Sequence, residues 1–251
     1  MTSLSVFIIC KNESQSIVDC IESVKWADEI IVLDSGSTDD TVELAKRYTD
    51  KVFVNEDWQG FGIQKQRAQS YATCDWVLSI DADERVTPEL KKEILDVVKL
   101  NNQGNVYAFP LLPNVFGVFL HHGGWYPAHK VRLYPRTAGK YGNQQVHEKL
   151  DFNKTMKTIN LKSDLLHFTY RDLEHYLVKS ANYAAAWSRQ KQQAGKKTNL
   201  LTGIAHGVGC FIKIYILKAG FLDGQHGFFI ALLSAHSTFA KYAALWLANK
   251  N

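Results

Sequence analysis

The segment WVLSIDADERVTPEL, residues 76–90, joins an apolar run to a cluster of acids and then to the start of a helix. Residues 76–80 are typical of a short strand that is buried on both faces. Thr87, Pro88 and Glu89 supply an N-cap, a proline at the first helical position and an acid in the first turn. Apolar residues then recur at helical spacing, at Leu90, Ile94, Val97 and Val98. The segment therefore predicts a strand, an acidic turn and a helix.

The same alternation occurs on the N-terminal side of this segment. Residues 4–10 and 29–33 are apolar runs typical of buried strands, and residues 51–54 predict a third strand. Apolar residues at helical spacing in 17–24, and capping residues at 37–40, predict helices between these strands. Alternating strands and helices predict an α/β fold with a mostly parallel sheet flanked by helices.

The composition changes on the C-terminal side. Prolines, glycines and aromatic residues are dense from about residue 105 to 150, which predicts short antiparallel strands and loops. A polar helix is expected over residues 171–197, followed by an apolar and aromatic tail. We therefore divide the chain into an α/β domain at 1–150, a helical extension at 151–197 and an apolar helical tail at 198–251.

The 251 residues are 46 % hydrophobic and carry a formal net charge of +4, which fits one sizeable core. So mild a charge is compatible with anionic lipid or a phosphorylated substrate, and it does not indicate a nucleic-acid-binding protein. Cys10, Cys20, Cys74 and Cys210 lie among apolar residues without a CxxC pair, which indicates buried thiols in a reducing compartment. Residues 1–13 lack a signal-peptide pattern, so we expect a cytoplasmic protein.

Polar clusters follow three of the predicted strands, at residues 11–13, 34–41 and 81–84. The carboxyl ends of parallel strands meet at one edge of a sheet, where α/β proteins bind ligands. Each cluster taken alone could merely cap a helix. In the third cluster, however, Asp81 and Asp83 are spaced so that both carboxylates can face one hard cation, and oxygen ligands suit magnesium or manganese. We expect Asp83 to bind a divalent metal, with Asp81 facing the same metal or the ribose of a bound nucleotide.

The stretches SVFIICKNE (5–13), EIIVLDSGSTDDT (29–41) and WVLSIDADERVTPEL together resemble the inverting glycosyltransferases of family two, which have a GT-A fold. The later stretches HHGGWYPAHKVRLYPR (121–136), YGNQQVHEKL (141–150) and GFLDGQHGFFIALLSA (220–235) are similar to bacterial lipopolysaccharide inner-core transferases that add β-1,4-glucose to heptose. The resemblance covers nearly the whole chain. It implies transfer of a hexose from a UDP-hexose donor, with a divalent metal as cofactor.

The resemblance also implies individual roles. Contacts with the nucleotide-sugar are expected from three strand ends and one lysine, namely Cys10, Lys11, Glu13, Asp34, Lys65, Asp81 and Ala82. Lys65 could instead lie on a solvated helix face. The chain lacks the QxxRW motif of processive family members, which favours the addition of a single sugar.

The catalytic base is expected where family members carry an acidic pair after the acceptor loop. His147 and Glu148 are the nearest counterpart in this chain. An inverting transfer needs a group that takes the proton of the acceptor hydroxyl, and Glu148 suits that role. His147 would then be a third metal ligand beside Asp81 and Asp83. The alternative is that the pair only stabilises a turn.

Acceptor contacts are expected from residues 121–136. Trp125 offers a flat face for a sugar ring, and Arg132 and Arg136 suit phosphates on the acceptor because of the fork geometry of the guanidinium. The three histidines of this stretch are spaced unlike any standard zinc site.

The tail has two uncharged runs, residues 198–212 and 224–240, which are shorter than the roughly 20 apolar residues that span a bilayer. Lys213, Lys218 and Lys241 lie at or near their ends. This arrangement favours peripheral attachment to a membrane surface, at the cytoplasmic face of the inner membrane. The alternative is a helical hairpin that packs on the core or in a homo-oligomer interface.

These observations predict an inverting, metal-dependent, non-processive hexosyltransferase, and the resemblance implies that it moves glucose from UDP-glucose to an inner-core heptose of lipopolysaccharide. Another glycan, or a protein, is the alternative acceptor. A non-catalytic nucleotide-sugar-binding or membrane scaffold protein is the alternative function. Haloacid-dehalogenase-like phosphatases also carry a DxD after a strand, but after their first strand and not their fourth, which disfavours that class.

Overall fold

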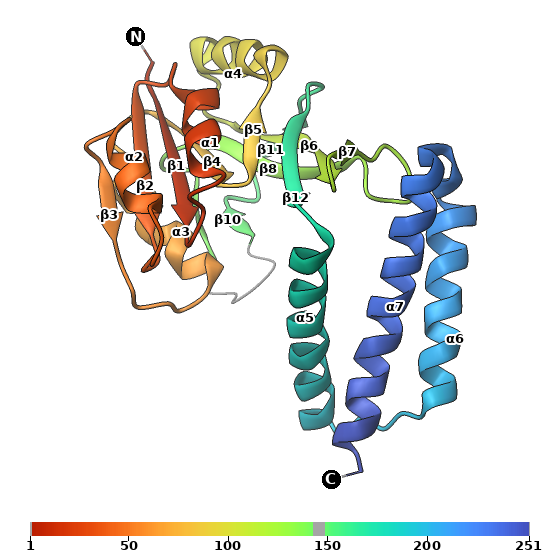
Figure 1. Ribbon diagram of the computed structural model, residues 1–251. Coiled ribbons are helices and arrows are strands. Elements are labelled where there is room, and N and C mark those ends of the chain that lie inside the picture. Colours follow the sequence, from red (N-terminus) through yellow and green to blue (C-terminus); the bar gives the residue numbers. More distant parts are fainter. Residues whose placement is uncertain (1, 143–148, 251) are drawn as a thin grey trace. The chain divides into compact units, whose positions relative to one another are not determined.

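The computed structural model describes residues 2–142 and 149–250, which form two compact units (Figure 1). Unit 1 comprises residues 1–111 and 128–167, and unit 2 comprises residues 112–127 and 168–251. This division differs from the predicted boundaries at residues 150 and 197. The chain leaves unit 1 at residue 112 and returns at residue 128, and the helix predicted as an extension belongs to the same unit as the tail.

Unit 1 holds a sheet and the helices that cover it. Its strands are β1 (Leu4–Cys10), β2 (Glu29–Asp34), β3 (Val52–Val54), β4 (Trp76–Asp81), β5 (Glu84–Val86), β8 (Ala128–Pro135), β9 (Gly139–Tyr141), β10 (Leu150–Phe152) and β11 (Lys157–Asn160). Its helices are α1 (Ile17–Val24), α2 (Thr41–Lys46), α3 (Phe61–Ser70) and α4 (Pro88–Leu100). The strands β6 (Asn105–Val115) and β12 (Leu165–Tyr170) run from unit 1 into unit 2, which also contains β7 (Val118–Phe119).

The strand order of the main sheet is β3-β2-β1-β4-β8-β6-β12-β5. The first four of these strands are parallel, whereas β8 pairs antiparallel with both β4 and β6. The expected α/β fold is confirmed, and β11 adds one further parallel pairing, with β6. The order of the strands reverses at β1, because β2 and β4 lie on its two sides. The crevice outside the carboxyl ends at such a point is where α/β sheets bind ligands.

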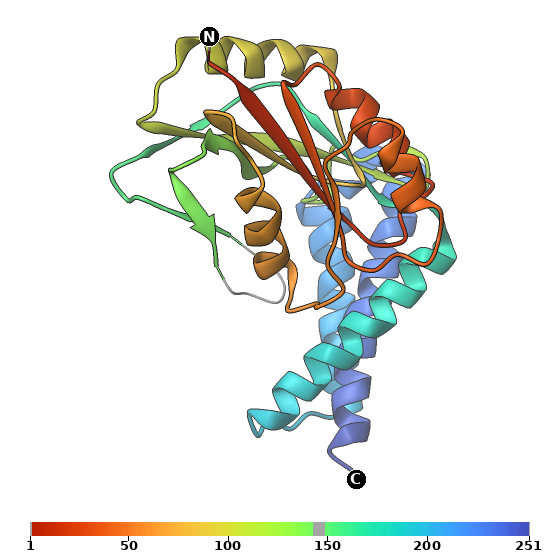
Figure 2. The ribbon, with the colours of Figure 1, turned by 90° about the vertical axis from the view of Figure 1, so that its left-hand side faces the viewer.

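Strand β1 is buried on both faces because its side chains alternate between two apolar layers. Val6 and Ile8 pack in the cluster that contains the apolar faces of α1 and α4, and Phe7 and Ile9 pack in the cluster that contains Ala68 of α3. Figure 2 shows α1 and α3 on opposite sides of the sheet. This double burial fixes the carboxyl end of β1 at the sheet edge.

Helices α4 and α3 form for different reasons. In α4 the Thr87 hydroxyl oxygen accepts the Leu90 N–H at 3.1 Å and Pro88 is the first helical residue, as the sequence predicts. Helix α3 lacks an apolar stripe, and it buries the polar side chains of Gln64 and Lys65 completely. Partners from other elements, described below, stabilise these two side chains, so the helix depends on tertiary contacts.

Unit 2 is mainly helical. Its helical segments are α5 (Leu173–Gln193), α6 (Leu200–Phe211), the π-helical η1 (Ile212–Leu217), the 3₁₀ turn η2 (Gly220–Asp223) and α7 (Gly224–Ala248). Helix α7 packs against both α5 and α6. Ser180 Oγ of α5 donates to Ser237 Oγ of α7 at 2.6 Å. Gly203 of α6 allows a close approach, since a Cβ there would lie 3.1 Å from the Cβ of Tyr242 on α7.

The four cysteines, all of which the structure describes, are free thiols. Cys10 and Cys20 are buried, and Cys74 and Cys210 are partly exposed. The prediction of buried thiols is thus confirmed for the first two.

Candidate active site

The acidic turn after β4 is fixed by its own hydrogen bonds. The Asp81 N–H donates to Glu84 Oε2 at 2.9 Å, which ties the last residue of β4 to the first residue of β5. Arg85 Nη1 donates to the carbonyl oxygen of Ala82 at 2.8 Å. Asp83 is thereby held between the two strands, with 26 % of its side chain exposed.

Asp81 lies between two buried cations. Lys65 Nζ is 2.8 Å from Asp81 Oδ1, and Arg132 Nη2 is 2.7 Å from Asp81 Oδ2. The Lys65 side chain is completely buried, so the alternative that it lies on a solvated helix face is wrong. Burial acts to raise the pKa of Asp81, but the charges of Arg132 and Lys65 outweigh it and hold that pKa well below its usual range. Since cations already pair with both of its oxygens, Asp81 is a poorer metal ligand than Asp83.

Arg132 is an internal counterion. Its Nη2 also donates to Glu84 Oε1, and only 4 % of its side chain is exposed. Burial raises the pKa of Glu84, although the charge of Arg132 opposes this effect. The sequence predicts that Arg132 binds a phosphate of the acceptor, but its placement does not support that role. A guanidinium enclosed with two carboxylates is neutralised and shielded from a ligand.

His167 on β12 lies against Asp83. Its Nε2 is 3.2 Å from Asp83 Oδ2, because β12 pairs with β5 and places His167 opposite Glu84. Burial acts to lower the pKa of His167, but the hydrogen bond to Asp83 and the charge of Asp83 outweigh it, and the pKa is raised. No motif marks this histidine in the sequence. Sequence reasoning missed it because only the pairing of β12 with β5 brings it to the acidic turn.

Asp83 and His167 fit a divalent cation. Carboxylate oxygen and neutral imidazole nitrogen are both suitable ligands, and adjacent ligands of an octahedral ion lie about 3 Å apart. The 3.2 Å between Asp83 Oδ2 and His167 Nε2 meets that spacing. Within residues 2–142 and 149–250, no three His, Cys, Asp or Glu side chains are grouped so that they could hold a metal. Further ligands would come from water, from a phosphorylated molecule or from outside the described residues, where the predicted ligand His147 lies.

The carboxyl ends of β1 and β2 carry the other predicted nucleotide contacts. Cys10 is opposite Asp34 in the sheet, and its Sγ donates to Asp34 Oδ2 at 3.6 Å. Lys11 is exposed and Glu13 is half-buried in the loop that follows β1. On the other side of β1, Asp81 is opposite Ile9. The strand pairing therefore brings Cys10, Asp34 and Asp81 to one edge, as expected from three parallel strands.

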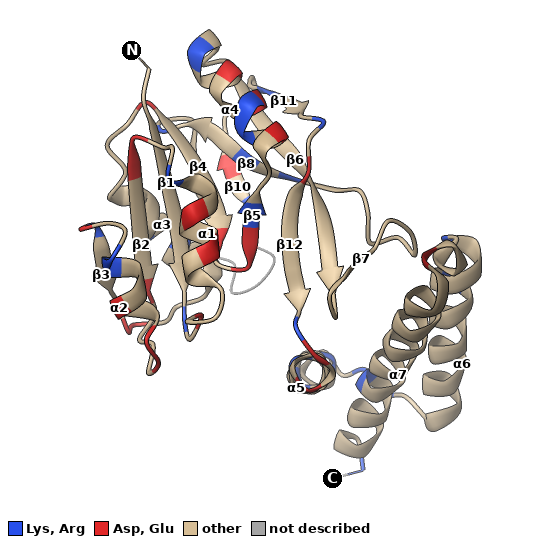
Figure 3. Ribbon diagram, turned by 45° about the horizontal axis from the view of Figure 1, so that its top comes forward, with Lys and Arg blue, Asp and Glu red and all other residues tan. Residues whose placement is uncertain are grey.

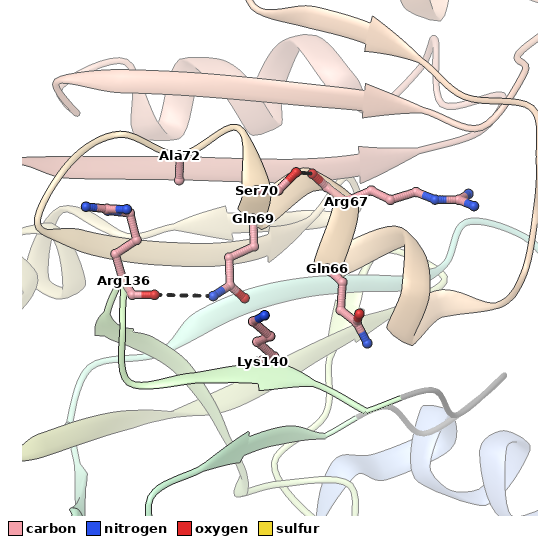
Figure 4. A pocket seen from close by; sticks show the side chains of 7 residues that line it. All are labelled: Gln66, Arg67, Gln69, Ser70, Ala72, Arg136 and Lys140. Carbon is pink, nitrogen blue, oxygen red and sulfur yellow. Dashed lines mark hydrogen bonds between the residues drawn. The ribbon is translucent and has the colours of Figure 1, made fainter.

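Arg136 lines a different part of unit 1. Its Nε donates to the Cys74 carbonyl at 2.9 Å, and its side chain lines a pocket of about 440 Å³ between α3 and β9 (Figure 4). The other lining residues are Gln66, Arg67, Gln69, Ser70, Ala72 and Lys140. Asp81 and Asp83 are not part of this lining, and an acceptor role for Arg136 stays a prediction.

Trp125 belongs to unit 2, where its ring meets that of Tyr170 edge to face at 6.5 Å. His147 and Glu148 lie outside the described residues. The roles of these three residues stay predictions.

The parallel strands in the order β3-β2-β1-β4, with a DxD turn and a carboxylate–imidazole pair at the carboxyl end of β4, define a GT-A glycosyltransferase. The chain belongs to glycosyltransferase family 2, because the model of that family, Glycosyl transferase family 2, matches residues 5–163. The fold class, the enzyme class and the family expected from the sequence are confirmed.

Two similar proteins are also described as glycosyltransferases. An uncharacterized glycosyltransferase of Rickettsia prowazekii (strain Madrid E) is 32 % identical over 98 % of this chain and 87 % of its own length. The lipopolysaccharide core biosynthesis glycosyltransferase LpsC of Rhizobium meliloti (strain 1021) is 28 % identical over 96 % of this chain and 93 % of its own length.

Among solved structures, the chain is similar to glucosyl-3-phosphoglycerate synthase from Mycobacterium tuberculosis, which was crystallised with Mg²⁺ and UDP. The two are 28 % identical, with a TM-score of 0.37. The match covers 45 % of this chain and 44 % of the synthase, so the chain spans less than half of that protein.

Proposed function

We propose that this glycosyltransferase moves glucose from UDP-glucose, one sugar at a time and with inversion, to a heptose of the lipopolysaccharide inner core. The similarity to LpsC supports the acceptor class. The observation that supports binding of a UDP-sugar donor is the Asp83–His167 pair, which lies beside the buried cations Lys65 and Arg132. It combines a place for a dication with an acidic turn that buried ion pairs fix in position, at the point where the strand order reverses.

In this proposal the residues of the chain have separate tasks. Asp83 and His167 hold a divalent metal, which when bound neutralises charge on the diphosphate of the donor. Lys65 and Arg132 fix the position of Asp81. Glu148 takes the proton of the acceptor hydroxyl as that oxygen bonds to the anomeric carbon. The bond from the anomeric carbon to the UDP oxygen breaks in the same step, and its electron pair leaves with UDP.

A donor screen tests this function without an acceptor. The full-length protein is incubated with UDP-glucose, UDP-galactose, UDP-N-acetylglucosamine or GDP-mannose, with manganese, magnesium or EDTA, and nucleotide release is measured. We expect slow release of UDP from UDP-glucose, dependent on metal, because water replaces the missing acceptor. Faster hydrolysis of another sugar nucleotide would contradict the donor assignment. Tight UDP binding without turnover of any donor, also when deep-rough lipopolysaccharide is added, would indicate a non-catalytic protein.

We also propose that unit 2 binds a membrane surface through α6 and η1. Leu200–Leu217 and Gly220–Ala248 are long and apolar enough to cross a membrane by length and composition, which corrects the expectation from the shorter uncharged runs because both helices extend beyond them. Figure 3 shows α6 and α7 almost without charged residues. One face of α6 and η1 carries apolar side chains that are each at least 42 % exposed, namely Leu201, Ile204, Val208, Ile212 and Ile216. Such a face fits lipid acyl chains.

The charges of the same segment fit an anionic lipid surface. Residues 194–251 contain six lysines, and Asp223 is their only acid. Asp223 is paired with His122 at 2.8 Å, and its side chain is 8 % exposed. The net positive charge of this segment is therefore left to interact with anionic headgroups. The protein would thus work at the cytoplasmic face of the inner membrane.

Replacing Val208 with Asp is expected to reduce binding to vesicles that contain phosphatidylglycerol by about tenfold or more, because a charge would enter the apolar layer. Sedimentation with such vesicles, at low and high salt, measures this binding. High salt should weaken binding of the unaltered protein. Leu100→Asp is the matched control, since Leu100 is 72 % exposed in unit 1. A full-length protein that never sediments with these vesicles would favour the alternative of a protein–protein interface.

A further inference from the structure

The edge of unit 1 that carries Asp34 also presents two aromatic side chains for which the proposed mechanism has no use. Residues 55–60 connect β3 to α3, and Phe61 is the first residue of α3. Trp58 is 45 % exposed and Phe61 is 40 % exposed. Their rings meet edge to face, with centroids 4.9 Å apart and planes at 88°. Exposed rings do not contribute the hydrophobic free energy that burial would give them. Adjacent exposed aromatic side chains therefore indicate a surface that binds a ligand.

Hydrogen bonds to α3 hold this loop in one shape. Arg67 Nη1 donates to Asn55 Oδ1 at 3.1 Å, and Arg67 Nη2 lies 2.7 Å from Asp57 Oδ2. Arg67 Nη1 also donates to the carbonyl oxygen of Asp57, and Gln59 donates to the Asp57 side chain at 2.6 Å. Because these hydrogen bonds already order the loop, it would lose little conformational entropy when a ligand binds to Trp58.

The loop is also attached to the turn that follows β2. The Asn55 N–H donates to the Asp34 carbonyl at 2.8 Å, and Gln64 Nε2 donates to Ser35 Oγ at 2.9 Å. The Glu56 side chain approaches Gly36 so closely that a Cβ on Gly36 would lie 3.1 Å from Glu56 Cγ. The aromatic pair is therefore built onto the turn that contains Asp34.

The same helix connects the pair to the diphosphate side of the proposed site. Phe61 and Lys65 are four residues apart in α3, so they are neighbours on one side of that helix, about one turn apart. Lys65 contacts Asp81, and Asp83 lies two residues further along. Helix α3 thus carries one ring of the aromatic pair at its first residue and, one turn later, the lysine that contacts Asp81.

The chemistry of the loop limits what this end can be. Glu56 and Asp57 are both acidic, and Arg67 pairs with only the second of them, so a phosphate or an anionic lipid headgroup is disfavoured. A neutral planar ring suits exposed aromatic faces, because stacking requires no charge. We propose that Trp58 and Phe61 form the stacking surface for the base of the nucleotide-sugar donor. This inference rests on the proposed function.

Comparison of UDP with inorganic pyrophosphate tests the inference. Both ligands carry the diphosphate, and only UDP carries a base. Calorimetry of the full-length protein with manganese should show that Trp58→Ala raises the Kd of UDP by about 5- to 100-fold and leaves the Kd of pyrophosphate unchanged. Trp58→Leu should behave like Trp58→Ala, because it keeps an apolar side chain without a π-face. Trp58→Tyr should stay within a few-fold of the unaltered protein.

Tyr71→Ala is the matched control, since Tyr71 is another exposed aromatic residue of unit 1, stacked on Phe53 at 3.8 Å. It should change neither Kd. Equal weakening of UDP and pyrophosphate by Trp58→Ala and Trp58→Leu would overturn the inference, as would unchanged UDP affinity in both. Tight UDP binding by the unaltered protein, with no effect of the Trp58 variants, would spare the proposed function. If the unaltered protein binds no UDP, both are wrong.

Discussion

Asp83→Asn is expected to reduce glucosyl transfer by about 10³-fold or more, because an amide binds a hard dication far less strongly than a carboxylate does. A loss of this size corresponds to several kcal/mol of stabilisation in the transition state. It would appear in kcat/KM with UDP-glucose and manganese. Calorimetry should show in addition that chelation weakens UDP binding to the unaltered protein, and that it has little further effect on the variant.

Controls separate the metal site from the fold. Asp96→Asn, at an exposed acid on α4, should leave turnover and UDP affinity unchanged. Asp81→Asn should instead lower the free energy of unfolding by about 2–4 kcal/mol, because it leaves Lys65 and Arg132 buried with one carboxylate fewer. The value is below that of a fully enclosed pair, since Asp81 is 31 % exposed. Equal affinity of the unaltered protein for UDP with and without EDTA would contradict the Asp83–His167 site.

Glu148→Gln is expected to lower kcat by about 10²- to 10⁴-fold, which is the usual contribution of a general base. Glutamine keeps the size and hydrogen-bonding reach of the side chain and removes its basicity. The affinity for UDP-glucose should therefore stay within a few-fold of that of the unaltered protein. Single-turnover transfer to deep-rough lipopolysaccharide measures the first quantity, and calorimetry measures the second.

Asp151→Asn provides the comparison, because Asp151 is an exposed acid on β10, close to Glu148 in the sequence. Near-normal turnover of Glu148→Gln would show that another group accepts the proton. Loss of both kcat and donor affinity would instead assign Glu148 to donor binding or to the fold. Either result would send the search for the base to His147 next.

Most elements of the N-terminal half could be predicted from the sequence because their signals are local, whereas α3, which lacks an apolar stripe, and the short strand β5 were not. Each signal lies within a short stretch of sequence: the continuous apolar run of β1, which is buried on both faces, the N-cap Thr87 and the apolar stripe of α4. Once the strands are known to be parallel, the meeting of Cys10, Asp34 and Asp81 at one edge follows from topology. The motifs at these strand ends also carry the family, which the match over residues 5–163 shows.

Contacts between distant segments decided the rest. The sequence presents Asp81 and Asp83 as equals, and only the fold gives Asp81 two cations and Asp83 a histidine. The pairing of β12 with β5 brings His167 to the turn, and no periodicity or cap encodes that pairing. Likewise, Lys65 has polar sequence neighbours typical of a surface helix, but the fold buries its side chain completely and pairs it with Asp81. The division into units follows the same rule, because residues 112–127 pack with helices that come much later in the chain. Local sequence patterns determine each helix and strand through propensity and burial. The pairing of charged side chains depends instead on which elements become neighbours, and only the tertiary structure determines those neighbours.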